Sequence, residues 1–188
     1  MNRISERDFV DAAQELECEV AAIQAVAEVE SAGDAFLSNG EPKILFEAHH
    51  FSRLTNHKYD VTHPRISSPT WKKSLYIGGE GEHRRLQAAA HLDRQAALEA
   101  TSWGMFQIMG FNWRQTRATS LQDFINTIYS GERGQLRLFV GFIKGDNRLL
   151  RAIQKKNWIL FAKYYNGAGY SANKYDVKLE QAYKRALH

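Results

Sequence analysis

The sequence has 188 residues, of which 44% are hydrophobic and 24% are charged, and its net charge at pH 7 is +4. This length suffices for one well-filled core, so we expect a single domain over residues 1–188. No segment is apolar over the length of a membrane span, and the single cysteine, Cys18, can form no internal disulfide. These features exclude a membrane-spanning protein and a disulfide-stapled domain.

The start of the chain lacks the apolar core of a secretory signal, so we expect synthesis in a cytoplasm. A sequence pI near 9.2 makes anionic polymers compatible partners: nucleic acid, an acidic cell wall or a membrane surface. The basic residues are scattered and no known nucleic-acid-binding module is recognisable. Most of these residues are therefore interpreted as solvated surface charge, and charge alone does not choose among the partners.

Two helices are predicted at the N-terminus. Ser5 and Asp8 form a capping box that opens the first helix. The second lies within residues 20–33, with Gly33 just past its end, and its apolar stripe consists of Val20, Ile23, Val26 and Ala27. On a helical wheel Glu30 falls inside this stripe, whereas Glu28 points to the opposite side.

Glu30 is the first candidate catalytic residue. Gly33 can cap the helix, which places Glu30 in the last turn, where the helix dipole disfavours the ionised carboxylate. Desolvation acts in the same direction, so we expect a raised pKa for Glu30, as a general acid requires. Carboxylates at helix ends are common, however, and helix geometry alone does not make this one functional.

A second carboxylate follows shortly after this helix. Asn39-Gly40 lies between two short apolar runs and predicts a hairpin or a tight turn. In the second run, Ile44 and Phe46 point to one face and Lys43, Leu45 and Glu47 to the other. We expect Glu47, at the end of this strand, to flank a cleft together with Glu30.

The middle of the chain contains a polar loop and an alanine-rich helix. A helical turn or two at residues 48–51 lead into a loop over residues 56–81, which is expected to wall a groove. Within this loop, residues 78–81 are interpreted as a flexible hinge. The adjacent pair His49-His50 lacks a spaced third ligand, so we assign it to packing or hydrogen bonding rather than to a metal. Residues 82–100 predict one core helix.

Helices dominate the rest of the chain. A block at residues 101–110 mixes small, aromatic and amide side chains in a way that no amphipathic pattern requires. Helices are predicted over residues 121–129, 135–144, 148–156, 158–164 and 172–187, with Ser120, Asp146 or Asn147, and Asn157 as caps. Two glycines interrupt this series near residues 164–170. The last helix carries Lys174, Lys178, Lys184 and Arg185, which either contact anionic envelope surfaces or form a solvated basic face.

Three blocks, in this order, resemble the lysozyme-like glycan cleavers related to goose-type lysozyme and the soluble lytic transglycosylases. They are Glu30-Ser31 at a helix end, the Ser-x-Gly-x-x-Gln-Ile-Met block at residues 102–109, and the Tyr-Asn-x-x-Gly block at residues 165–169. More closely, residues 25–31, 44–49 and 103–110 resemble the N-acetylmuramidase family of phage and prophage endolysins. One departure is Ala48, where family members often carry Arg.

This resemblance implies a mainly α, lysozyme-like helical domain with one small β-hairpin. The glycan groove would lie between an N-terminal lobe that contains the hairpin and a helical C-terminal lobe. The implied activity is that of an endolysin, which cleaves the β-1,4 bond between N-acetylmuramic acid and N-acetylglucosamine in peptidoglycan and lyses bacterial cells. The protein would be a monomer that binds glycan strands but not nucleic acid, without stable membrane insertion, and that acts on the cell wall after release from the host cytoplasm.

By the same resemblance Glu30 would be the catalytic acid, and Glu47 the base that orients water or stabilises the positive charge, although the second group is less fixed in the family. The blocks would place Ser102, Trp103, Gln107, Tyr165, Asn166 and Tyr170 in the groove. Aromatic rings suit sugar faces, but each of these rings is equally compatible with the core. Ser102 has no neighbouring pattern that activates a nucleophile and is expected to make a positioning hydrogen bond. No cofactor and no metal are expected.

Three alternative functions stay open at this stage. A lytic transglycosylase would use the same Glu as acid and base and would release 1,6-anhydro products. A non-catalytic wall-binding protein would bind the glycan without cutting it. A nucleic-acid binder would show salt-dependent retention on DNA.

Overall fold

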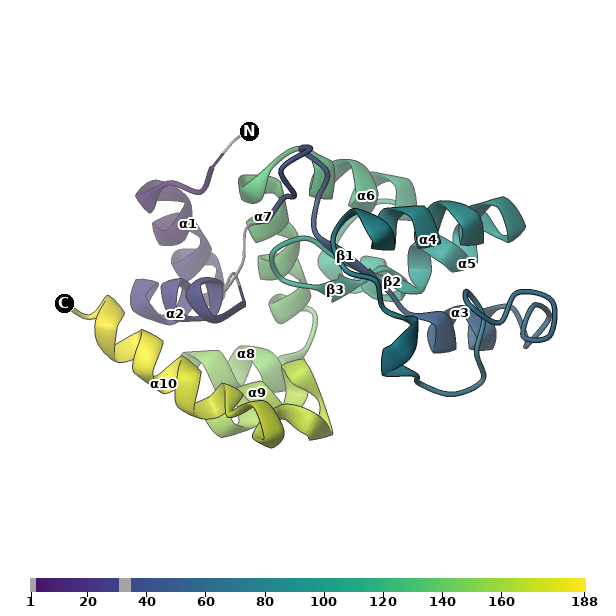
Figure 1. Ribbon diagram of the computed structural model, residues 1–188. Helices are drawn as coiled ribbons and strands as arrows, with labels where there is room; N and C mark the ends of the chain where they lie inside the picture. The colour runs from purple at the N-terminus through teal and green to yellow at the C-terminus, as the bar shows by residue number, and fades with distance from the viewer. Residues whose placement is uncertain (1–2, 31–34) are drawn as a thin grey trace.

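Short helices around a small antiparallel sheet make up the computed structural model, which describes residues 3–30 and 35–188 (Figure 1). The α-helices are α1 (Glu6–Leu16), α2 (Val20–Glu30), α3 (Ala48–Leu54), α4 (Glu80–Leu92), α5 (Arg94–Glu99), α6 (Leu121–Tyr129), α7 (Glu132–Lys144), α8 (Asn147–Gln154), α9 (Trp158–Asn166) and α10 (Tyr175–Ala186). The 3-10 helices are η1 (Lys73–Leu75), η2 (Gly110–Thr116) and η3 (Ala168–Asn173), and the strands are β1 (Ile44–Phe46), β2 (Thr101–Trp103) and β3 (Ile108–Met109). The predicted mainly α fold is confirmed. Within the described residues, no helix has both the length and the apolar character needed to cross a membrane.

The N-terminal helices form as their sequences predict. The Asp8 backbone N–H donates to Ser5 Oγ at 3.3 Å, and the Ser5 backbone N–H donates to Asp8 Oδ2 at 3.0 Å, which completes the capping box. In α2 the side chains of Ile23, Val26 and Ala27 are buried. The predicted Gly33 cap lies outside the described residues. Cys18, between the two helices, is half-buried, and burial raises the pKa of its thiol to about 11.

The prediction of one helix over residues 82–100 is wrong, because Asp93 ends α4 and begins α5. Asp93 is extended (φ −155°), and its Oδ1 accepts a hydrogen bond from the Ala96 backbone N–H at 2.9 Å. A carboxylate at this position satisfies an N–H at the start of the new helix, which favours the break.

The caps predicted for the later helices are confirmed at Ser120, Asp146 and Asn157. Helix α7 begins three residues earlier than expected, at Glu132, and α9 continues to Asn166. The last helix begins later than predicted, at Tyr175, because η3 occupies the preceding residues.

The sheet joins distant parts of the chain. Strand β1 pairs with β2, with Leu45 opposite Ser102, and β2 pairs with β3 through the turn at residues 104–107. The predicted turn at Asn39-Gly40 is present: the Leu37 N–H donates to Glu41 O at 2.7 Å, and Gly40 has a φ of 84°. However, the run before this turn makes one isolated bridge, Phe36 with Pro42, instead of a strand. The hairpin is therefore β2–β3.

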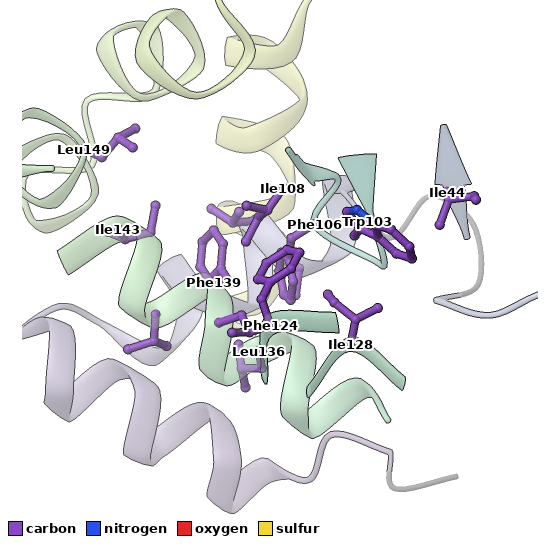
Figure 2. Close-up of a cluster of buried hydrophobic side chains, with 14 of the residues drawn as sticks. Ile44, Trp103, Phe106, Ile108, Phe124, Ile128, Leu136, Phe139, Ile143 and Leu149 are labelled. Carbon is purple, nitrogen blue, oxygen red and sulfur yellow. The ribbon is translucent and has the colours of Figure 1, made fainter. Parts of the chain in front are cut away.

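The main core lies around α7 (Figure 2). Phe139 of α7 stacks on Phe106, with ring centroids 4.4 Å apart and an interplanar angle of 17°. Phe124, Ile128 and Trp103 are buried in the same cluster. This core fixes the β2–β3 turn against α7 and so positions one wall of the site described next.

Candidate active site

Glu30 is the last residue of α2 and lies at the boundary between the core and an open cavity. Its Oε1 accepts a hydrogen bond from Asn166 Nδ2 of α9 at 3.3 Å. Burial raises the pKa of Glu30 to about 7, against the opposing effects of the Asn166 hydrogen bond and the positive charge of Lys178. A carboxyl group with this pKa is protonated in a large fraction of molecules at neutral pH and can donate a proton.

The cavity beside Glu30 has a volume of about 300 Å³. Its other lining residues come from the β1 segment, the β2–β3 turn and two loops: Leu37, Lys43, Ile44, Leu45, Gly79, Gly104, Met105 and Gln107. The size is at the lower end of the range typical of small-ligand sites. Thus the carboxyl expected to donate a proton and the predicted groove residue Gln107 line the same cavity.

Hydrogen bonds fix Gln107 in the β2–β3 turn. Its Oε1 accepts from Ser102 Oγ and its Nε2 donates to Gly104 O, both at 2.8 Å. Gln107 also has a positive φ of 47°, a backbone conformation that residues other than Gly adopt rarely. Ser102 is itself buried, so its contribution is to orient Gln107.

A residue that the sequence analysis missed, Gln135 of α7, anchors this turn. Its Oε1 accepts from the Met105 backbone N–H at 2.6 Å, and its Nε2 donates to Ile128 O at 3.1 Å. Gly104 has a φ of +69°, and a Cβ there would lie 2.6 Å from Gln135 Oε1. The sequence did contain a sign of this role: Gln135 is a polar residue on the apolar side of a helix. It lies one residue before the buried Leu136 and four residues before the buried Phe139.

The interpretation of Trp103 as a groove residue is wrong. Its side chain is 1% exposed and belongs to the core in Figure 2. The indole Nε1 donates to Leu98 O at 3.0 Å, which satisfies the one polar atom of the ring. A ring enclosed in this way has no face available to a sugar.

Tyr165 belongs to α9 and Tyr170 to η3, in the C-terminal part of the chain. Tyr165 Oη donates to Phe106 O at 2.7 Å, and its ring stacks on Phe161 with centroids 5.5 Å apart. Burial, together with the nearby Glu30 carboxyl, raises the pKa of Tyr165 well above its usual value. Tyr170 is partly buried against the core. Within the described part of the chain, neither tyrosine is among the residues that line the Glu30 cavity, whereas Asn166 contacts Glu30 directly.

Glu47 occupies the position before α3 and is held by two neighbours. Tyr76 Oη donates to Glu47 Oε2 at 2.5 Å, and His49 Nδ1 lies 3.3 Å from the same oxygen. Burial and the Glu47 carboxylate raise the pKa of Tyr76, which keeps its hydroxyl protonated. Glu47 is not among the described residues that line the Glu30 cavity, although Leu45, two residues earlier in the chain, does line it.

The predicted histidine pair makes packing and hydrogen-bonding contacts. The two rings lie 4.1 Å apart, and His50 also contacts Phe111 edge-on at 5.2 Å. Burial, with the charges of His49 and Arg53, lowers the pKa of His50 to about 4. Across residues 3–30 and 35–188, no group of three metal-binding side chains gathers.

A second residue missed from the sequence, Glu82 of α4, connects the long loop to the sheet. Its side chain is fully buried and accepts hydrogen bonds from the backbone N–H groups of Phe46 (3.1 Å), Ile77 (2.8 Å) and Gly78 (3.1 Å) and from Arg85 Nη1 (2.7 Å). Burial opposes ionisation, but these hydrogen bonds and the Arg85 charge hold the pKa of Glu82 below its usual range. Glu82 therefore holds the start of the predicted hinge, residues 78–81, next to Gly79, which lines the cavity.

Two comparisons with known proteins match this chain. A model of the Muramidase family, described as N-acetylmuramidase, matches residues 19–187. The crystal structure of the Burkholderia AP3 phage endolysin superposes with a TM-score of 0.92 at 39% sequence identity, covering 98% of this chain and 71% of that one. A comparison with curated proteins found no match. The matched family region includes Glu30, Asn166 and every residue that lines the Glu30 cavity.

Proposed function

Because the chain belongs to the N-acetylmuramidase family of lysozyme-type glycoside hydrolases, we propose that it is an endolysin that uses Glu30 as the proton donor. The bond cleaved is the β-1,4 linkage between N-acetylmuramic acid and N-acetylglucosamine in peptidoglycan. The observation that carries the assignment of Glu30 is its pKa of about 7 beside a cavity.

The proposed chemistry begins with proton transfer from Glu30 to the glycosidic oxygen. Bond cleavage then passes through an oxocarbenium-like transition state. Asn166 donates to Glu30 Oε1, so it orients the carboxyl and supports the carboxylate that forms after the transfer. Gln107, fixed by Ser102, lines the same cavity and offers a polar contact to the sugar.

Glu47 is the second catalytic group in this proposal, with the task of orienting water or stabilising the developing positive charge. Tyr76 and His49 both contact Oε2, so the proposal assigns this task to the other oxygen, Oε1. Replacement of Glu47 by Gln should lower kcat with little effect on KM if this assignment is correct. Unchanged kcat would remove Glu47 from the mechanism.

The proposal also covers the organisation and the setting of the protein. The chain acts as one catalytic domain and as a monomer, with its glycan groove between the part that contains the sheet and the helical C-terminal part. It is made in the host cytoplasm and reaches peptidoglycan after release, without stable membrane insertion and without a nucleic-acid partner. Its net charge of +4 favours approach to an anionic wall.

Product analysis with purified peptidoglycan tests the proposed function. The wild type should release fragments with a reducing muramic acid end, and Glu30→Gln should lower this rate by at least about 10²-fold, as expected for a general acid. Fragments with a 1,6-anhydro end would instead identify a lytic transglycosylase. Binding of the wild type to peptidoglycan without any fragments would identify a wall-binding protein and refute the catalytic assignment.

A further inference from the structure

A second cavity adjoins the one beside Glu30. Its volume is about 560 Å³, and Met105 lines both cavities. Helix α2 contributes to both cavities: Glu30 lines the first and Ala27 the second, about 4.5 Å apart along the helix axis, and Gln24 and Glu28 extend the second cavity around the helix. A ligand that extends beyond Glu30 past Met105 therefore enters the second cavity.

The walls of this cavity combine apolar side chains with charges of both signs. Ile4 and Phe9 supply apolar surface, and Glu28, Glu132 and Arg185 supply the charges. Residues in or beside α1, α2 and α10 line this cavity, and Figure 1 shows these three helices on the left of the molecule. Such walls suit a ligand that carries carboxylate, ammonium and small apolar groups together.

The charged residues lie at the accessible edge of the cavity. Arg185 Nη2 lies 2.5 Å from Glu28 Oε1, with the two side chains 59% and 51% exposed. An ion pair this exposed contributes little to stability, so a ligand carboxylate can replace Glu28 at small cost. A guanidinium carries five N–H donors, so one contact through Nη2 does not saturate it. Glu132 Oε2 accepts a 3.3 Å hydrogen bond from the Ile4 backbone N–H.

The chemistry of peptidoglycan supplies a group that matches these walls. Each muramic acid carries a short peptide on its lactyl ether, and this peptide contains carboxylates, alanine methyl groups and, in many cell walls, an ammonium group. The sugar that bears the peptide is also the one whose anomeric carbon is attacked. When that carbon lies beside Glu30, the peptide must leave the first cavity close to the scissile bond.

We propose that the second cavity binds the peptide of the muramic acid residue at the scissile bond, an inference that rests on the proposed function. Arg185 pairs with a peptide carboxylate, Glu132 faces the ammonium group where one is present, and Phe9 contacts the alanine methyl groups. The enzyme then recognises peptidoglycan by its peptide as well as by its sugars.

The test compares kcat/KM on glycan strands that carry peptides with kcat/KM on strands from which an amidase has removed them. The quantity of interest is the ratio of the two values for each variant, because any loss of folded protein cancels in the ratio. Arg185→Gln removes the charge, and Ala186→Trp fills the cavity from the end of α10. Lys184→Gln is the matched control, because Lys184 is the neighbouring cation on α10 but lines a different depression, beside Trp158.

The wild type should give a ratio clearly above one. Arg185→Gln should lower the ratio about tenfold, the effect expected of one hydrogen-bonded charge pair, and Ala186→Trp should lower it as well. Lys184→Gln should keep the ratio of the wild type. A ratio of one for the wild type, or ratios that neither variant changes, would overturn the peptide assignment while leaving the proposed function intact. If the wild type cleaves neither substrate, the proposed function fails and this inference falls with it.

Discussion

The raised pKa of Glu30 makes a quantitative prediction about stability that is independent of any activity assay. The folded protein holds this carboxyl at a pKa of about 7, against an ordinary value of 4.5. Each unit of pKa difference is worth about 1.4 kcal/mol, so the folded state loses about 3 kcal/mol from this group as the pH rises through that interval. The direction follows from proton binding: between the two values the folded state holds a proton that the unfolded state has released, so a rising pH favours unfolding.

Glu30→Gln removes this titration without changing the size of the side chain. The difference in free energy of unfolding between Glu30→Gln and the wild type should therefore grow in favour of the variant by about 3 kcal/mol between about pH 4 and about pH 9. Urea unfolding at several pH values measures this difference, and all other titrating groups cancel because both proteins contain them.

Glu28→Gln is a matched control on the same helix, because its carboxylate is exposed and paired with Arg185. We expect this substitution to change the free energy of unfolding by less than about 1 kcal/mol at every pH in the same range. If the stability gain of Glu30→Gln were independent of pH, or largest at low pH, Glu30 would not be a desolvated carboxyl and the argument for it as the acid would lose its physical basis.

Three further substitutions test the surroundings of the site. Asn166→Ala removes a hydrogen bond that favours ionised Glu30, so the loss of kcat at high pH should move up by about one pH unit; a pH profile that moves down would contradict this. Gly104→Ala should destabilise the protein by more than about 1 kcal/mol and impair cleavage, because the new Cβ meets Gln135 at a positive φ; thermal unfolding and product release measure both effects. Glu82→Gln should lower the free energy of unfolding, measured in urea, by at least about 2 kcal/mol. The buried side chain loses its charge-assisted hydrogen bonds, and Arg85 loses its charge partner. An unchanged urea midpoint would show that the loop does not depend on Glu82.

Local patterns in the sequence predicted the parts of the structure that depend on neighbouring residues. Helical periodicity placed Glu30 on the buried side of α2, and cap residues located the starts of several later helices. The alternation at residues 43–47 correctly put Ile44 and Phe46 on one face of the strand, where both are buried, and Leu45 on the other. Each of these features follows from the geometry of a single element.

Features that depend on distant residues could not be predicted in this way. The partner of β1 lies more than fifty residues along the chain, so the turn at Asn39-Gly40 suggested the wrong hairpin. Trp103 was assigned to the groove from its neighbours in the sequence, whereas its ring is buried in the core and bonds to Leu98 O of α5. Gln135 accepts a hydrogen bond from the Met105 backbone N–H, 30 residues away, and Glu82 accepts one from the Phe46 backbone N–H, 36 residues away. No short sequence motif predicts such contacts.

The half-buried thiol of Cys18 affects how readily the protein is oxidised after its proposed release from the cytoplasm to the cell wall. Thiolates, not thiols, react with oxidants and disulfides, and a pKa of about 11 leaves only about one molecule in 10⁴ ionised at neutral pH. Two copies of the chain are therefore slow to become cross-linked when they leave a reducing compartment. Reducing agents should be unnecessary to keep the purified protein free of covalent dimers.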